Sequence, residues 1–124
     1  IVREEGFLYD NSMFDHDLPY LREDGLVEIP MRWELTDFPY LAWGGIFPAG
    51  GSRIAVYDDV LNNWLWELEA SCDMGHCYVI SFTPQTVGSP GRMFMVEKVL
   101  ERLGRKNIWI ATGEEIAAYT KNGH

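Results

Sequence analysis

Apolar residues recur at helical spacing in two stretches of this chain. From about Arg53 to Ala70 they fall three and four residues apart, which predicts a helix with one apolar face made of Ile54, Tyr57, Leu61, Trp64, Leu65 and Leu68. A second helix is predicted from Pro90 to Leu103, with Ser89 as its capping residue and Gly104 at its end. Its inward face is predicted to hold Met93, Val96, Leu100 and Leu103.

Short apolar runs between and around these helices predict strands. Tyr78 to Phe82 is β-branched, aromatic and uncharged, as expected of a strand that is covered on both faces. Other short strands are predicted at 7–9, 26–30, 33–35 and 108–111, with a loop at 10–24 and an irregular, glycine-rich stretch at 36–51. Thr112 to Glu115 has the pattern of a capping box that opens a short helix through Tyr119. This alternation indicates βαβ units, and it predicts an α/β fold with parallel strands.

Length and charge limit the classes of function. The chain has 124 residues, enough for one domain at most, and its net charge of −9 argues against nucleic acid as a partner. No window approaches 18 uncharged apolar residues, so no membrane-spanning segment is expected. Cys72 and Cys77 are too few and too widely spaced for a zinc or redox motif, and we expect them to be reduced, buried and structural. Free cysteines favour a cytoplasmic protein.

The segment after the Tyr78–Phe82 strand is the first candidate for chemistry. Thr83 and Pro84 end the strand, and the loop that follows a parallel strand usually carries the functional residues of an α/β protein. Arg92, in the first turn of the next helix, could fix this loop through backbone carbonyls or pair with an acidic group.

A second candidate is the aromatic stretch that surrounds Asp37. Asp37 could hydrogen-bond a catalytic group, or it could simply turn the chain before Pro39. The aromatic residues could stack on a sugar or enclose a small heterocycle, or they could be core: Trp33, Phe38, Tyr40, Trp43 and Phe47.

Metal ligands are scarce. The chain has three histidines, His16, His76 and His124, and a catalytic zinc needs three protein ligands. His16 lies between Asp15 and Asp17, but adjacent side chains of an extended loop point in different directions. We therefore expect no metal site on this chain alone.

Six segments, in order, carry a resemblance to a known family. They are EEGFLYDNS at 4–12, PY at 19–20, GLVEIP at 25–30, LTDFPY at 35–40, SFTPQTVGSPGR at 81–92 and IWIATGEEI at 108–116. Together they resemble the C-terminal half of the polysaccharide deacetylase (NodB-homology, carbohydrate esterase 4-like) family, in its allantoinase-like and peptidoglycan-deacetylase-like branch. The resemblance covers almost the whole chain, 1–124, as one C-terminal portion of a single domain.

The resemblance implies half of a deformed (β/α) barrel, completed by another chain or by a missing N-terminal half. That complement would carry the catalytic aspartate and the zinc, and we expect an oligomer with it as partner. The run from Ile1 to Gly6 is accordingly predicted to be the last turn of a helix rather than a true start. An extracellular location would follow if the complement carried a secretory leader.

The implied function is hydrolysis of a C–N amide bond in an acetylated sugar or a small cyclic amide. Thr83 and Asp37 would occupy the catalytic positions of this chain, with Trp33, Phe38, Tyr40, Trp43 and Arg92 binding substrate. Thr83 stands where the family has a histidine, and a threonine hydroxyl does not titrate near neutral pH. A degenerate enzyme, an altered mechanism and a substrate that needs no acid there all remain open, as does a catalytically inactive binding or structural subunit.

Overall fold

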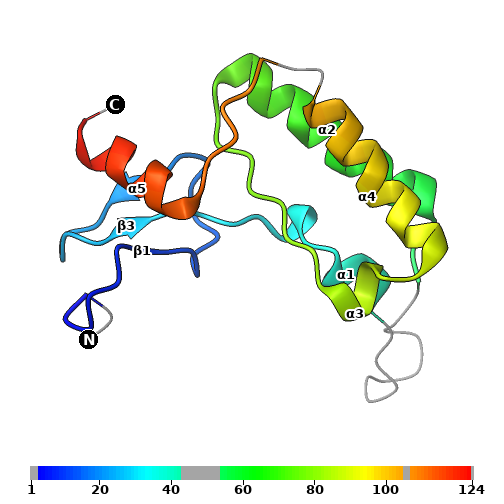
Figure 1. Cartoon of the computed structure of the whole chain (residues 1–124), viewed down its shortest axis with the longest axis horizontal. Helices are drawn as coiled ribbons and strands as arrows, with labels where there is room; N and C mark the ends of the chain where they lie inside the picture. The colour runs from blue at the N-terminus through cyan, green and yellow to red at the C-terminus, as the bar shows by residue number, and fades with distance from the viewer. Residues whose placement is uncertain (1–2, 43–53, 105–106, 124) are drawn as a thin grey trace.

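The computed structural model describes residues 3–42, 54–104 and 107–123, which form a small sheet and a set of helices (Figure 1). In chain order the elements are β1 (Tyr9–Asp10), β2 (Tyr20–Leu21), β3 (Val27–Glu28), the 3-10 helix η1 (Trp33–Leu35), α1 (Phe38–Leu41), α2 (Tyr57–Met74), α3 (Pro84–Val87), α4 (Pro90–Leu103) and α5 (Gly113–Lys121). Among the described helices, none has both the length and the apolar character that crossing a membrane requires.

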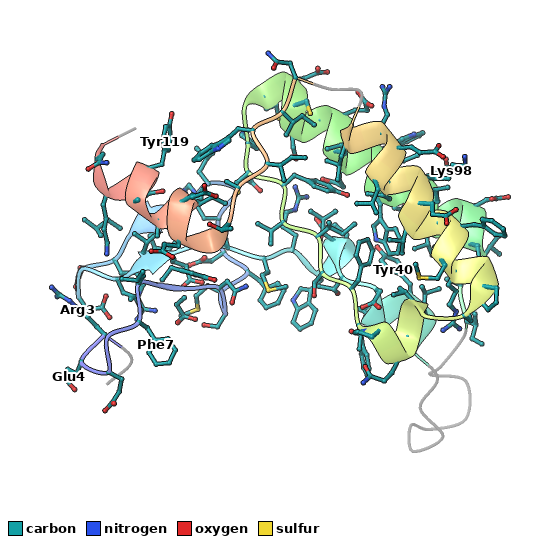
Figure 2. The ribbon with its side chains drawn as sticks, in the orientation of Figure 1. Arg3, Glu4, Phe7, Tyr40, Lys98 and Tyr119 are labelled. Atoms are coloured by element: carbon teal, nitrogen blue, oxygen red, sulfur yellow. The ribbon has the colours of Figure 1, made fainter. Side chains whose placement is uncertain are left out.

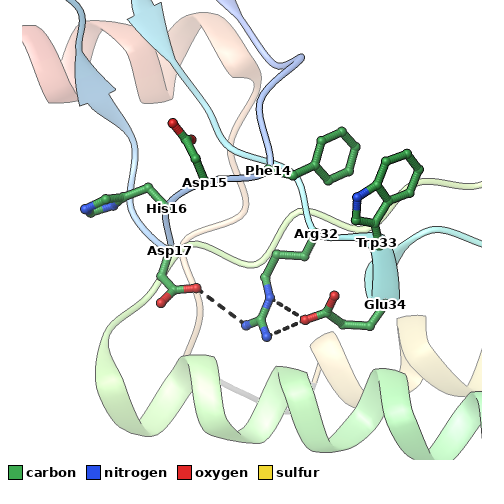
Figure 3. A pocket seen from close by; sticks show the side chains of 7 residues that line it. All are labelled: Phe14, Asp15, His16, Asp17, Arg32, Trp33 and Glu34. Carbon is green, nitrogen blue, oxygen red and sulfur yellow. Dashed lines mark hydrogen bonds and ion pairs between the residues drawn. The ribbon is translucent and has the colours of Figure 1, made fainter.

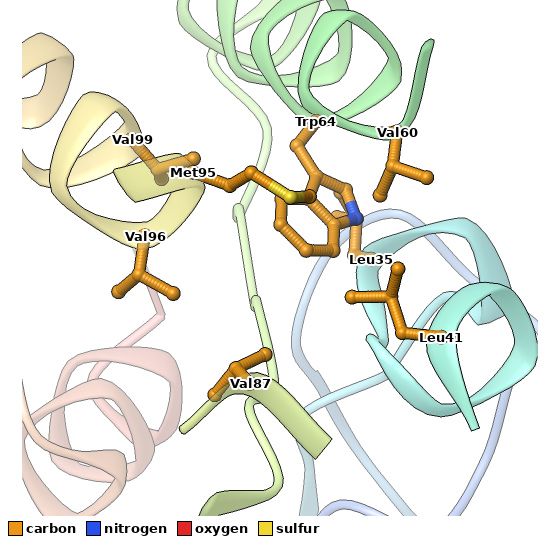
Figure 4. Packing of buried hydrophobic residues seen from close by; sticks show 8 residues of the cluster. All are labelled: Leu35, Leu41, Val60, Trp64, Val87, Met95, Val96 and Val99. Atoms are coloured by element: carbon orange, nitrogen blue, oxygen red, sulfur yellow. The ribbon is translucent and has the colours of Figure 1, made fainter. Parts of the chain in front are cut away.

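The two long helices, α2 and α4, pack side by side and run in the same direction (Figure 1). Together with η1, α1 and α3 they enclose the larger hydrophobic core. The buried residues of this core are Leu35, Leu41, Val60, Trp64, Val87, Met95, Val96 and Val99 (Figure 4). Trp64 is fully buried and meets the ring of Phe82 edge-on, with centroids 5.5 Å apart.

Both long helices confirm the predicted elements, but their buried faces differ in detail. In α2, Trp64 and Leu68 are buried as predicted, whereas Tyr57 is exposed, as is Ile54, which precedes the helix. In α4, Val96 is buried as predicted, but the prediction for Met93 and Leu100 was wrong, because Met95 and Val99 are the residues buried beside Val96. Both sets obey helical spacing, and only the neighbouring helix decides between them.

The sheet is small and mixed. Its order is β1-β3-β2, with β1 parallel to β3 and β2 antiparallel to it. The helix α5 covers this sheet through a second core of Val27, Ile29 and Ala117, with Cys77, Val79 and Ile116 packed around it. Gly113, the first residue of α5, lies so close to the Tyr9 ring that a side chain there would collide with it.

Several predicted strands do not form. Residues 33–35 are the 3-10 helix η1, and β2 lies inside the predicted loop. The Tyr78–Phe82 run makes a single parallel bridge, between Ser81 and Thr36, and no ladder forms over 108–111 within the described residues. A strand needs a partner for its N–H and C=O groups, and among the described residues the 78–82 and 108–111 runs have almost none. The α/β class is confirmed in part, as a mixed α/β domain, while a parallel half barrel is not confirmed.

The capping box that opens α5 is confirmed. The Thr112 hydroxyl accepts from the Glu115 N–H at 3.3 Å, and the Glu115 carboxylate accepts from the Thr112 N–H at 2.7 Å. At the other end of the chain, the glycine that was predicted to close a helix is Gly6, which has a φ of 87° and closes a turn by donating its N–H to the Arg3 carbonyl.

Candidate functional site

Two extended segments from distant parts of the chain meet at the candidate site. The Ser81 N–H donates to the Leu35 carbonyl at 2.9 Å, and the Asp37 N–H donates to the Ser81 carbonyl at 3.3 Å. These bonds flank the parallel bridge from Thr36 to Ser81. Beyond the bridge each segment enters a short helix, α1 or α3, and the two helices contact each other (Figure 1).

Asp37 and Thr83 join at the ends of these segments. The Asp37 carboxylate accepts from the Thr83 backbone N–H at 2.8 Å and from the Thr83 hydroxyl at 3.0 Å. Asp37 is 1% exposed, whereas Thr83 is half-buried. The sequence singled out both residues, and the structure brings them into direct contact.

The start of α3 is fixed by hydrogen bonds to the backbone of Thr83. The Thr83 carbonyl accepts from the N–H groups of Thr86 and Val87 at 2.8 and 2.9 Å. Pro84 follows at the first turn, where a proline needs no hydrogen-bond partner for its nitrogen. The backbone around Thr83 is therefore fixed on both sides.

Arg92 fixes the turn between α3 and α4. Its Nη1 donates to the Thr86 carbonyl at 2.5 Å, and its Nε donates to the Tyr57 hydroxyl at 3.2 Å. The guanidinium also lies 5.8 Å from the centroid of the Tyr57 ring. Arg92 thus makes the carbonyl contact expected of a loop-fixing arginine, and it ties that turn to α2.

The predicted aromatic residues do not share one environment. Phe38 follows Asp37 and is 60% exposed, while Tyr40 is half-buried against the larger core. Trp33 is exposed and stacks on Phe14, with centroids 4.1 Å apart and the planes 6° from parallel. Trp43 and Phe47 lie outside the described residues.

Trp33 belongs to a second feature, a hollow of about 230 Å³. Figure 3 shows the residues that line it, which are Phe14, Asp15, His16, Asp17, Arg32, Trp33 and Glu34. Phe14 and Arg32 were not predicted from the sequence as members of such a feature. The signal available was weak: an arginine next to Trp33, and a phenylalanine beside the acidic loop.

Arg32 is the electrostatic centre of this hollow. It pairs with Glu34 at 2.5 Å, Glu67 at 2.9 Å and Asp17 at 3.7 Å. Burial alone would lower the pKa of Arg32, but the hydrogen bond that it donates to Glu34 and the charges of Glu67, Glu34 and Asp17 raise it. The guanidinium therefore stays charged and holds three acidic side chains from separate elements.

The residues around His16 diverge. Asp17 turns toward Arg32, Asp15 points the other way, and the His16 ring faces away from both (Figure 3). The His16 Nδ1 accepts from the Leu18 N–H at 3.1 Å. Across the described ranges, no three His, Cys, Asp or Glu side chains come together in a way that could hold a metal ion.

The cysteines are half-buried and unbonded. Cys72 and Cys77 form no disulfide, and Cys77 packs at the edge of the second core. Burial raises the pKa of the Cys77 thiol, which keeps it in the unreactive protonated form.

Comparison with solved structures supports the family resemblance. A crystal structure described as "putative polysaccharide deacetylase from Mycobacterium smegmatis" is similar to 96% of this chain, with 32% sequence identity and a TM-score of 0.86. The resemblance to polysaccharide deacetylases is confirmed. This deacetylase-like chain spans 43% of that relative's length, which is consistent with a C-terminal half. No family model and no curated protein matches it.

Proposed function

We propose that this deacetylase-like chain is part of a metal-dependent hydrolase of C–N amide bonds and that it forms one wall of the substrate pocket. The single observation that carries the proposal is the similarity to a protein described as a deacetylase over 96% of the chain. The joined ends of the two parallel segments, at Asp37 and Thr83, are the expected place for chemistry in such a fold.

The proposed substrates are acetylated sugars or small cyclic amides. Phe38 lies next to Asp37 and exposes most of its ring, so it can stack on a sugar face. The other proposed members of the substrate wall are Trp33, Tyr40, Trp43 and Arg92. Trp33 stacks on Phe14 in the separate hollow, Tyr40 also serves the core, and Arg92 also holds the α3–α4 turn.

The metal does not fit this chain's own described residues, since they offer no group of three ligands. The proposed zinc and the carboxylate that would assist it therefore belong to a complementary part of the barrel. That part is the proposed partner, either a second chain or further sequence of the same polypeptide.

The test starts from native material purified without separating its components. Intact mass spectrometry with metal analysis should find this chain together with roughly 15–20 kDa of further deacetylase-like sequence, the remainder of a barrel of about 250 residues, and bound zinc. That material should then hydrolyse at least one member of a panel of N-acetylated sugar oligomers and cyclic amides. A pure complex that holds stoichiometric zinc and hydrolyses none of them would contradict the proposal.

A matched pair of variants then tests the pocket wall. Phe38→Ala should raise KM for the hydrolysed amide, because the stacking surface is lost. Phe94→Ala is the control, since Phe94 is 65% exposed, comparable to the 60% of Phe38, but lies on α4. Equal effects of the two changes on KM would show that Phe38 is not part of the substrate pocket.

The alternative is a catalytically inactive binding or structural subunit, and the observation that favours it is Thr83. Its hydroxyl is bound to a buried carboxylate and cannot take the place of a titrating histidine. The change Thr83→His, made in the complete complex, distinguishes a lapsed enzyme from one with a modified mechanism. A gain of amide hydrolysis would mark a lapsed enzyme, whereas loss of an existing activity would show that threonine belongs to a modified mechanism.

A further inference from the structure

Every hydrogen-bonding group of Thr83 is assigned except the lone pairs of its hydroxyl oxygen. The backbone N–H donates to one oxygen of Asp37, and the hydroxyl donates to the other. The carbonyl already accepts from Thr86 and Val87. What the half-buried side chain can still offer to a ligand is acceptor capacity alone.

The Asp37 carboxylate determines which way the Thr83 hydroxyl points its proton. A carboxylate has acceptors only, so the hydroxyl proton of Thr83 must lie between the two side chains. Asp37 is buried and backbone-anchored at both its N–H and its carbonyl, so it cannot turn away. The direction of the Thr83 hydroxyl is therefore fixed before any ligand arrives.

We infer that Asp37 is a positioning residue that makes Thr83 a hydrogen-bond acceptor for the substrate, and that the substrate presents its amide N–H to it. This inference rests on the proposed function, which makes these segment ends part of a substrate pocket. It specifies secondary or primary amides, whose nitrogen carries a hydrogen, and it disfavours tertiary amides, whose nitrogen has none.

The change Asp37→Asn should reverse the polarity. The Thr83 N–H still needs an acceptor, so the amide oxygen of asparagine must face it. The NH₂ group then faces the Thr83 hydroxyl oxygen and donates to it, which turns the hydroxyl proton toward the ligand. A role of Asp37 in folding alone would not produce this reversal.

The test measures binding of two small amides to the full chain by NMR titration of backbone signals around Thr83. Acetamide carries N–H donors and N,N-dimethylacetamide carries none. The wild-type chain should bind acetamide about three- to tenfold more tightly, the range of one hydrogen bond. Thr83→Ser should keep this ratio, and Asp37→Asn should abolish or invert it.

Thr83→Val controls for the larger size of the dimethyl probe, because it keeps the shape of threonine without the hydroxyl. Signals of Trp64 and Val99 report that each variant retains the core. An equal affinity of folded wild-type chain for both amides, an unchanged ratio in Thr83→Val, or no saturable binding of either amide would overturn the inference. Since the readout needs no hydrolysis, its failure is separate from failure of the proposed reaction.

Discussion

The carboxylate of Asp37 takes the place of a strand partner for Thr83. Two backbone bonds join the segments that end at these residues, and the next bond of the ladder is supplied by the side chain, at 2.8 Å from the Thr83 nitrogen. A second bond, at 3.0 Å, engages the threonine hydroxyl. One buried side chain thus both terminates the pairing of two segments and positions the residue that stands where the resembled family has a histidine. Figure 2 labels Tyr40 of α1, the helix that begins directly after Asp37.

Removing this carboxylate should destabilise the fold. Asp37→Ala leaves the Thr83 N–H and hydroxyl without their acceptor, and we expect the free energy of unfolding to fall by about 2–3 kcal/mol. Chemical denaturation measures it. Asp73→Ala, at an exposed position near the end of α2, is the matched control and should change stability by less than about 0.5 kcal/mol. Equal losses for the two variants would show that the pairing carries no stability.

Arg92 should be irreplaceable by lysine. Its fork reaches the Thr86 carbonyl and the Tyr57 hydroxyl together, and a lysine ammonium on a single stem cannot satisfy both in this geometry. We expect Arg92→Lys to lose about 1 kcal/mol and to speed amide hydrogen exchange in α3. The exposed ion pair of Lys98 with Glu101 provides the comparison, since Lys98→Ala should leave α3 unaffected. Unchanged exchange in Arg92→Lys would contradict the loop-fixing role.

The start of α5 should be sensitive to acid. Hydrogen bonds from the Thr112 backbone and then from its hydroxyl hold the pKa of Glu115 below its usual value. A lowered pKa in the folded state means that the stabilising contribution is complete above the unfolded-state value of about 4.3 and disappears as the pH falls through the folded value. Glu115→Gln should weaken α5 at pH 7 and make no difference at pH 2, as measured by helix signals of α5. Glu114→Gln, one residue earlier, is the control, because Thr112 and Glu115 still form the capping box in that variant.

Tyr78 should confer sensitivity to alkali. Burial, with a smaller part from the charge of Glu67, raises the pKa of Tyr78 far above its ordinary value, and its hydroxyl donates to the Trp64 carbonyl at 3.0 Å. The neutral phenol therefore stabilises the fold fully below about pH 10, and this contribution is lost as the pH rises further. Tyr78→Phe should cost about 1 kcal/mol at pH 7 and reduce the fall in stability above pH 10. Tyr9→Phe, in strand β1, is the control, and equal effects of the two changes above pH 10 would contradict the assignment.

The helices could be predicted from the sequence because their signals are local. The capping box at Thr112, the proline at position 90 and the apolar spacing around Trp64 each act within a few residues, and each appears in the structure. Strands depend on distant partners. The composition of the Tyr78–Phe82 run fits a buried extended segment, but its one bridge to the described residues is with Thr36, and no local pattern specifies that pairing.

The residues of the candidate site could be predicted from the sequence, but the contact between them could not. Asp37 and Thr83 were each singled out by resemblance to a family, yet 46 residues separate them and nothing in their spacing indicates a bidentate contact. The stacking of Trp33 on Phe14 could not be predicted for the same reason, since Phe14 lies in an extended loop whose path is set by tertiary contacts.

The two cores meet along one extended run. Trp64 lies fully inside the core of α2 and α4, while Trp109 contacts Tyr119 of α5, with ring centroids 5.1 Å apart, beside the core of the sheet. Tyr78, Ile80 and Phe82 pack on the first core, and Cys77 and Val79 pack on the second, so each core depends on the path of the same segment. Heat or denaturant should therefore change the emission of Trp64 and Trp109 together, each followed in a variant that lacks the other tryptophans, as expected of one cooperative unit.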